Sequence, residues 1–285
     1  IKMAKTHLFK NLDYETYNKE NKISDLFKID LKQYGEIDSK QIRSTFYSVD
    51  PSNKDPFTAE LDDLIRLHYL VKKRKVTTVL EFGIGHSSLA LSHALSLNKN
   101  KFSKDLTHLR RSNPFELHSI ENNLDWVEHT KQNFKKDFEY LNEISNFHYC
   151  SLEVGDFNGR MCTYYHNIPN LSPDLIYLDG PDQFSADGSL RGMGTNHPDR
   201  MPMSADILSI EHFLCPGTLI VVDGRTANAR FLKCNLQRDW SYCHDQSLDQ
   251  HFFELIEEPL GIYNRDHINF SLGEDWYEKN KHLIR

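Results

Sequence analysis

Two glycines and an acidic residue stand where a short apolar run passes into a helical pattern. After Val79–Phe82, Gly83 and Gly85 let the backbone turn sharply and approach a ligand without obstruction from a Cβ atom. The helix that follows, which Ser87 can cap, offers N–H groups and a positive dipole end to a carboxylate or phosphate. Glu81 can accept a hydrogen bond from an ammonium group. The segment therefore predicts a ligand with both kinds of group.

Three further acidic residues each end an apolar run with strand character. Glu121 follows residues 117–120, Asp179 follows 174–178 and Asp223 follows 218–222. Ligands of open α/β sheets collect at the carboxyl ends of the strands, so we expect these acids to face one site. Asp179 and Asp223 could also bind a divalent metal, which would acidify an acceptor hydroxyl. Asp179 is thus a candidate catalytic, cofactor-binding and metal-binding residue.

The candidate acceptor side lies after the last two of these runs. Arg225, Asn228 and Arg230 could bind a carboxylate, a phosphate or sugar hydroxyls, because guanidinium groups suit anions. Residues 182–202 are polar and rich in glycine, which favours a lid over the acceptor. Within and beyond this lid, His197 and His251 are candidate general bases, because imidazole titrates near neutral pH.

The elements that would position these residues alternate between strand and helix patterns. We expect strands at 76–82, 116–120, 147–154, 174–178 and 218–222, and helices at 56–71, 87–97, 125–141 and 203–214. Such alternation predicts an α/β fold with a doubly wound, mostly parallel, Rossmann-like sheet. Residues 251–260 and 262–272 are expected to add an antiparallel hairpin at the C-terminal end.

The chain divides into two expected units. Residues 1–55 are polar with scattered apolar positions and predict a helical or irregular N-terminal cap. Residues 56–285 form the main domain, whose first helix can begin at Pro56.

These motifs, in this order, resemble those of the class I S-adenosylmethionine-dependent methyltransferases over roughly residues 56–272. The resemblance implies that the Glu-x-Gly-x-Gly turn binds the cofactor and that Glu121 holds both ribose hydroxyls. It also implies that Ser151 and Leu152 flank the adenine, with residues 155–157 as the alternative. Metal-dependent members related to catechol methyltransferases have Asn after the second strand-end acid, where this chain has Gly224.

A second departure is the distance between Glu81 and Glu121, which is about twice the usual spacing between a glycine turn and its ribose acid. A polar surface insertion over Asn98–Pro114 would account for the difference. The resemblance implies a methyltransferase, and we expect O-methylation of a small polar acceptor such as a sugar. One alternative is a Rossmann-like nucleotide-binding protein or dehydrogenase, but the dinucleotide motif has a third glycine where this chain has Ser88. Another is a catalytically inactive cofactor-binding scaffold.

The composition limits the classes of partner and the compartment that we expect. The 285 residues carry 34 Lys and Arg against 41 Asp and Glu, and this acidic balance argues against a nucleic-acid partner. No apolar run approaches the length that a membrane-spanning helix needs, so no membrane contact is expected. Five cysteines without a Cys-x-x-Cys pair are typical of a reducing compartment, and we expect a cytoplasmic protein. The pattern leaves the oligomeric state open.

Overall fold

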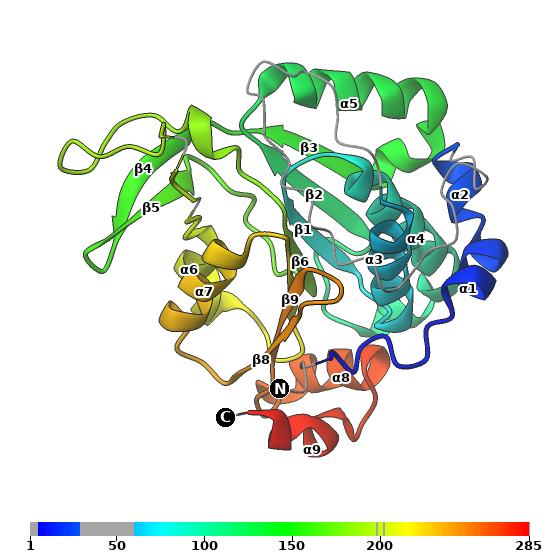
Figure 1. Cartoon of the computed structure of the whole chain (residues 1–285). Helices are drawn as coiled ribbons and strands as arrows, with labels where there is room; N and C mark the ends of the chain where they lie inside the picture. The colour runs from blue at the N-terminus through cyan, green and yellow to red at the C-terminus, as the bar shows by residue number, and fades with distance from the viewer. Residues whose placement is uncertain (1–4, 29–59, 198, 202, 285) are drawn as a thin grey trace.

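A seven-stranded sheet runs through the centre of the protein in the computed structural model, which describes residues 5–28, 60–197, 199–201 and 203–284 (Figure 1). Its strands lie in the order β3-β2-β1-β6-β7-β9-β8. Their bounds are Thr78–Phe82 for β1, Glu116–Glu121 for β2, Ser145–Tyr149 for β3, Leu175–Leu178 for β6, Leu219–Asp223 for β7, Trp240–Asp245 for β8 and Gln250–Leu255 for β9. In this sheet β9 alone runs antiparallel to the other strands, which confirms the predicted fold class.

Helices cover both faces of this sheet because successive side chains of a buried strand point to opposite faces. Val79 and Tyr177 pack against α3, α4 and α5, whereas Leu80 and Ile176 pack against α6 and α7. These helices span Leu61–Lys73 (α3), His86–Phe102 (α4), Leu124–Asp137 (α5), Asp206–Ile210 (α6) and Thr226–Asn235 (α7). Short 3₁₀ helices occupy Asp105–His108, Glu139–Ile144, Gln183–Ser185, Glu211–Phe213 and Lys281–Leu283. Among the described residues, no helix has the length and apolar character needed to span a bilayer.

The N-terminal helices α1 (Tyr14–Asn21) and α2 (Ile23–Leu26) pack on the outer side of α3. Ile23 is fully buried against Leu61 and Ile65, and Tyr17 Oη lies 2.8 Å from His68 Nδ1. The expected helix start at Pro56, and the expected boundary between residues 55 and 56, fall outside the described residues.

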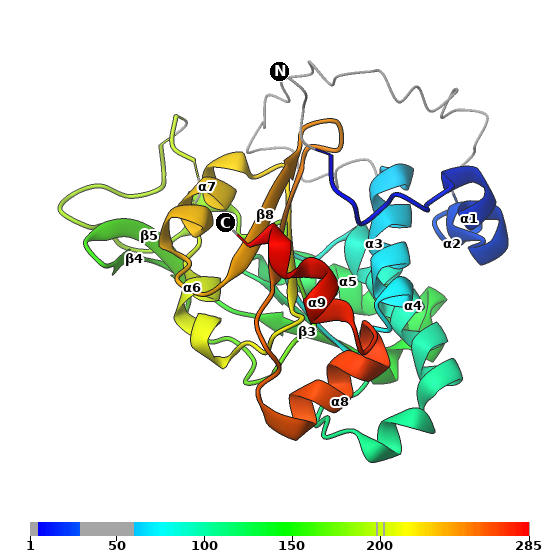
Figure 2. The same ribbon diagram turned by 90° about the horizontal axis from the view of Figure 1, so that it is seen from below.

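The C-terminal hairpin exists, but its predicted position was wrong. It is formed by β8 and β9, and residues 262–272 belong to the helix α8 (Gly261–Ser271) and its C-cap. Ile268 of α8 packs with Ile256 and with Trp276 of α9 (Trp276–Asn280), beside the sheet (Figure 2). Within α8 the buried residues Asn264 and Ile268 are four apart, as on one face of a helix, whereas β8 is a run of half-buried polar and aromatic residues with no clear strand pattern.

The predicted third strand, 147–154, merges two elements. The strand β3 ends at Tyr149, and Leu152 begins β4 (Leu152–Phe157), which pairs with β5 (Arg160–Tyr165) in a separate two-stranded ribbon (Figure 1). The ribbon turns at Asn158 and Gly159, with φ of 51° and 78°. Asn-Gly with two positive φ values is typical of a tight hairpin, so the sequence carried a signal for this turn.

The expected surface insertion at residues 98–114 is only partly exposed. Its first residues continue α4 to Phe102, and the buried Asn98 donates from Nδ2 to the carbonyl oxygens of Val71 and Val76. Near its end, Arg111 donates to Thr77 Oγ1 and forms an ion pair with Asp174. The insertion is therefore anchored to the amino ends of β1 and β6, where it does not disturb the opposite end of the sheet.

Candidate cofactor and acceptor site

The glycine turn after β1 crosses the end of β6 at very short distance. Gly83 has a φ of +102°, and a Cβ atom on Gly180 would lie 2.8 Å from the backbone nitrogen of Gly83. Gly180 N donates to Phe82 O at 2.6 Å, and Gly83 N donates to Ile120 O at 2.8 Å. Glycine is required at both positions, because any side chain would separate these backbones. The space beside Gly85 is open, since a Cβ atom on this residue would have no neighbour within 4 Å.

Glu81 lies beneath the turn and is fully buried. Three serine hydroxyls donate to its carboxylate: Ser87 to Oε1 at 2.6 Å, Ser88 to Oε2 at 2.6 Å and Ser119 to Oε2 at 2.5 Å. Burial raises the pKa of Glu81 to about 7, although the three hydroxyls oppose that shift. This carboxylate therefore ties β1 to β2 and to the start of α4, rather than presenting open oxygen atoms to a ligand's ammonium group.

Ser88, at the position of the third glycine in a dinucleotide motif, has a defined role in this turn. Its hydroxyl donates to Glu81 and accepts from the backbone nitrogen of Gly85 at 3.2 Å. Ser119, which the sequence pattern did not single out, points to the same carboxylate from β2. Its position two residues before Glu121 on the same strand places both side chains on one face.

Glu121 lies at the tip of β2, directly beside the glycine turn. Its Oε2 accepts from Ile84 N at 3.3 Å, and its Oε1 accepts from Asn122 N at 2.8 Å and Asn123 N at 3.0 Å. Burial raises the pKa of Glu121, while the backbone donors lower it. Despite the long interval after Glu81, Glu121 thus lies beside the glycine turn, and its ribose role stays a prediction.

Asp179 and Asp223 end the adjacent strands β6 and β7. Asp223 accepts from Tyr177 Oη at 2.7 Å and from Gln250 Nε2 at 3.1 Å, so each carboxylate oxygen already has a donor. As a whole residue Asp179 is exposed. The surrounding protein nevertheless shields its carboxylate from water, and this burial, followed by the charge of Asp223, raises its pKa to about 8. Glu81 and Glu121 contribute to the same shift, so four acids act on one region.

The donor set at these two strand tips does not fit a divalent metal. Within the described part of the chain, no third His, Cys, Asp or Glu completes a ligand cluster with Asp179 and Asp223. Both oxygens of Asp223 accept protein hydrogen bonds, and Gly224 offers no side-chain ligand.

The predicted substrate residues after β7 differ in their surroundings. Arg225 donates from its two terminal nitrogens to the carbonyl oxygens of Asp179 and Pro181, at 2.9 and 2.8 Å. Asn228 is fully buried, and its amide exchanges two hydrogen bonds with the Ser204 backbone. Arg230 is exposed. Arg225 and Asn228 thus hold the loops of the site, and of the three only Arg230 is open to an acceptor.

His251 is unsuited to the role of a general base in its observed position. It is fully buried on β9, with Nε2 3.0 Å from Thr226 Oγ1 and Nδ1 3.0 Å from Tyr242 Oη. Burial lowers its pKa to about 4, and its ring stacks on His244 with the centroids 3.8 Å apart. Both ring nitrogens are occupied, so His251 stabilises the hairpin against α7. His197 is exposed in the segment after β6.

The predicted adenine-flanking residues lie where β3 ends. Ser151 is exposed, and Leu152 is buried in the core on the side of α6 and α7. The alternative residues 155–157 lie farther along the ribbon, near its turn. Ser151 and Leu152 thus follow almost directly after β3, whereas residues 155–157 lie farther along the ribbon.

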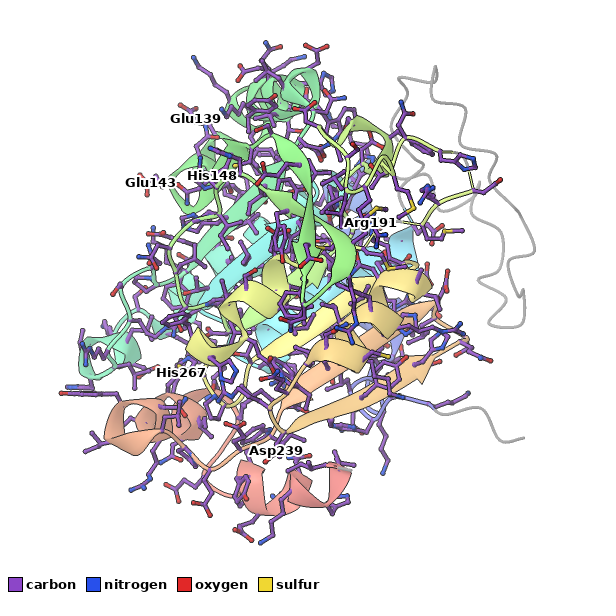
Figure 3. The ribbon with its side chains drawn as sticks, turned by 90° about the vertical axis from the view of Figure 1, so that its left-hand side faces the viewer. Glu139, Glu143, His148, Arg191, Asp239 and His267 are labelled. Carbon is purple, nitrogen blue, oxygen red and sulfur yellow. The ribbon has the colours of Figure 1, made fainter. Side chains whose placement is uncertain are left out.

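The segment after β6, predicted as a lid, is joined to the ribbon. Asp187 exchanges backbone hydrogen bonds with Leu152 and Val154, at 2.7 and 2.8 Å, and Thr163 N donates to Met203 O at 3.0 Å. In Figure 3, Arg191 of this segment lies well apart from His267, whose Nε2 is 3.5 Å from Asp174 at the amino end of β6. The segment is therefore fixed to both strands of the ribbon by backbone hydrogen bonds.

A cavity of about 260 Å³ lies on the other side of the glycine turn. It lies between the end of α2, the start of α4 and one side of α5, and its lining includes Phe27, Gly85, His86 and Trp126. Trp126 donates from Nε1 to Ile84 O at 2.5 Å, so the indole supports the turn from outside. The sequence pattern did not identify Trp126, although its place in the first turn after Glu121 puts it beside the glycine turn.

Comparison with known proteins gives matches to solved structures alone. No protein-family model matches the chain, and no curated protein matches it. An O-methyltransferase from Bacillus cereus in complex with SAH is 14% identical, with a TM-score of 0.44 over 86% of this chain and 100% of that one. A putative caffeoyl-CoA O-methyltransferase from Staphylococcus aureus is 15% identical, with a TM-score of 0.41 over 83% and 99%. A methyltransferase from Geobacter sulfurreducens is 13% identical, with a TM-score of 0.40 over 69% and 80%.

The strand order, the glycine turn after β1 and the acid at the tip of β2 define the class of fold. It is a doubly wound, mostly parallel, Rossmann-like fold that ends in an antiparallel hairpin, as the sequence predicted.

Proposed function

We propose that this protein is an S-adenosylmethionine-dependent methyltransferase that O-methylates a small polar acceptor. The observation that carries the proposal is the concentration of acids around the glycine turn. Burial is the main cause of the raised pKa of Asp179, the charges of Asp223, Glu81 and Glu121 add to that rise, and the charge of Arg225 opposes it. S-adenosylmethionine carries a sulfonium and an ammonium group, so this field favours it. A dinucleotide pyrophosphate would be repelled.

The residues of the turn suit the remaining parts of the cofactor. The N-terminus of α4 offers backbone N–H groups to the cofactor's carboxylate. Glu121 keeps lone pairs beside its backbone donors and can accept from both ribose hydroxyls. In this proposal Ser151 and Leu152 flank the adenine, as the sequence resemblance implies. When bound, the cofactor supplies a methyl group that a nucleophile can displace in line.

Asp179 is the candidate for handling the acceptor's proton. It is the strand-tip acid that remains open to solvent, and its raised pKa favours proton uptake at its carboxylate oxygens. The polar composition of residues 182–202, which the sequence predicts as a lid, and the exposure of Arg230 support a hydroxylated or anionic acceptor over an apolar one.

Isothermal titration calorimetry tests the proposal with S-adenosylmethionine, its demethylated product S-adenosylhomocysteine (SAH) and NADH. We expect the first two to bind and NADH to show no binding. Binding of NADH alone would favour the nucleotide-binding or dehydrogenase reading, and absence of binding by all three at millimolar ligand would contradict the proposal. Cofactor binding without turnover on a panel of hydroxylated acceptors would indicate an inactive scaffold.

A further inference from the structure

A continuous buried network reaches Asp223 from the helix α3. Arg66 of α3 is 2% exposed, and its Nε donates to Gln250 Oε1 at 3.1 Å. Gln250, the first residue of β9, is 1% exposed and donates from Nε2 to Asp223 Oδ1 at 3.1 Å. The sequence pattern does not indicate this network, because Arg66, Asp223 and Gln250 are not neighbours in the sequence.

The network has a fixed direction. A guanidinium group has donors and no acceptor, so Gln250 must turn its carbonyl oxygen toward Arg66. The amide nitrogen then faces Asp223 and can only donate to it. Tyr177 Oη, 2.7 Å from the other oxygen, completes the pair of contacts. The carboxylate of Asp223 is thereby held from two sides.

Arg66 is itself fixed by its neighbours on the same helix. It forms ion pairs with Asp62 and Asp63, and its Nη1 lies 3.3 Å from Tyr14 Oη. Burying an arginine is unfavourable unless its charge is compensated and its donors are used. Here Asp62 and Asp63 compensate the charge, which leaves Nε for Gln250.

We infer that Arg66 and Gln250 are positioning residues that fix the Asp223 carboxylate at the tip of β7, adjacent to Asp179 at the tip of β6, where its charge acts on the cofactor's sulfonium. The inference rests on the proposed function and extends it to the selection of the charged cofactor over its product. S-adenosylmethionine and SAH differ by a methyl group and one positive charge. A carboxylate held near the sulfur therefore strengthens the binding of the first relative to the second.

The test measures the dissociation constants of both compounds by calorimetry for the wild type, Arg66→Met and Gln250→Leu. We expect each substitution to lower the preference for S-adenosylmethionine over SAH by about three- to tenfold, the range of one lost hydrogen bond. Gln250→Leu keeps the ion pairs of Arg66, so it carries the test if Arg66→Met does not fold. A general loosening of the fold would weaken both ligands alike and leave their ratio unchanged.

Arg74→Met is the matched control. Arg74 caps the other end of α3, is also buried, and joins the same strand β9 through Glu254 at 2.8 Å. It lies at the opposite end of the strands, so its loss should leave the ratio at the wild-type value. Unchanged ratios in Arg66→Met and Gln250→Leu, or an equal fall in all three variants, would overturn the inference. Failure of the wild type to bind SAH would instead overturn the proposed function.

Discussion

Ser88 Oγ donates to Glu81 Oε2 at 2.6 Å, across the turn that the two residues enclose. Ser119 Oγ donates to the same oxygen from the neighbouring strand. A single buried carboxylate thus joins two strands and a helix start, and the shape of the glycine turn depends on it. Its protonation should therefore affect both stability and cofactor binding.

Replacing Glu81 with Gln should change how stability depends on pH. The pKa of Glu81 is raised from 4.5 to about 7, so the folded state binds a proton that the unfolded state has lost between these values. Its contribution to the free energy of unfolding falls as pH rises through this window, by at most about 1.4 kcal/mol per pH unit. Urea denaturation at pH 5 and pH 7.5 should show that the wild type loses stability relative to Glu81→Gln. Parallel pH profiles would contradict the assignment.

Replacing Gly180 with Ala should destabilise the protein. The added Cβ would lie 2.8 Å from Gly83 N, a backbone atom that cannot move aside easily, and overpacking of this kind costs about 1–3 kcal/mol. Gly85→Ala is the control, because its Cβ would meet no atom within 4 Å. We expect a lower midpoint of thermal unfolding for Gly180→Ala alone. Gly85→Ala should instead weaken SAH binding, since its methyl group would project where the ligand approaches the turn.

The fold could be predicted further than the site. Buried strands such as Leu219–Asp223 and their entry turns have strong local patterns, so the parallel sheet followed from the sequence. The strand β8 and the helix α8 were assigned wrongly because Trp240–Asp245 lacks a buried face, while residues 262–272 are apolar enough to pass for a strand. At the site, the acids at strand ends were found because their position follows from the topology.

The roles of individual polar residues could not be predicted in the same way. Whether Asn228 contacts a ligand or the Ser204 backbone depends on the path of a segment more than twenty residues away. The pairing of Gln250 with Arg66 likewise needs the tertiary structure, because 184 residues separate them. Residue type indicates what a side chain can do, whereas its partners decide what it does.

Replacing Glu121 with Ala should weaken SAH binding strongly. The loss of two charge-assisted hydrogen bonds to the ribose would cost about 1.5–3 kcal/mol each. Because Glu121 also accepts from Ile84, Asn122 and Asn123, Glu121→Gln is a useful comparison that keeps one acceptor oxygen. Calorimetry should rank the affinities as wild type, Glu121→Gln, then Glu121→Ala. Equal affinities in all three proteins would show that the ribose lies elsewhere.

Replacing His251 with Ala should remove a pH-dependent contribution to the free energy of unfolding. Burial lowers the pKa of His251 from 6.5 to about 4, so between these values the unfolded state binds a proton that the folded state does not. Its contribution to stability is therefore complete above pH 6.5 and is lost as pH falls toward 4. The variant also leaves the hydroxyls of Thr226 and Tyr242 without this partner, which should lower stability by about 1–3 kcal/mol at pH 7.5.

Urea denaturation of wild type and His251→Ala at pH 4.5, 6 and 7.5 measures both effects. We expect the difference in the free energy of unfolding to be largest at pH 7.5 and to shrink at the two lower values. Because the ring is enclosed, SAH affinity should change by less than the stability does. A difference in the free energy of unfolding that is constant with pH would show that His251 is not buried, and His251 would again be a candidate general base.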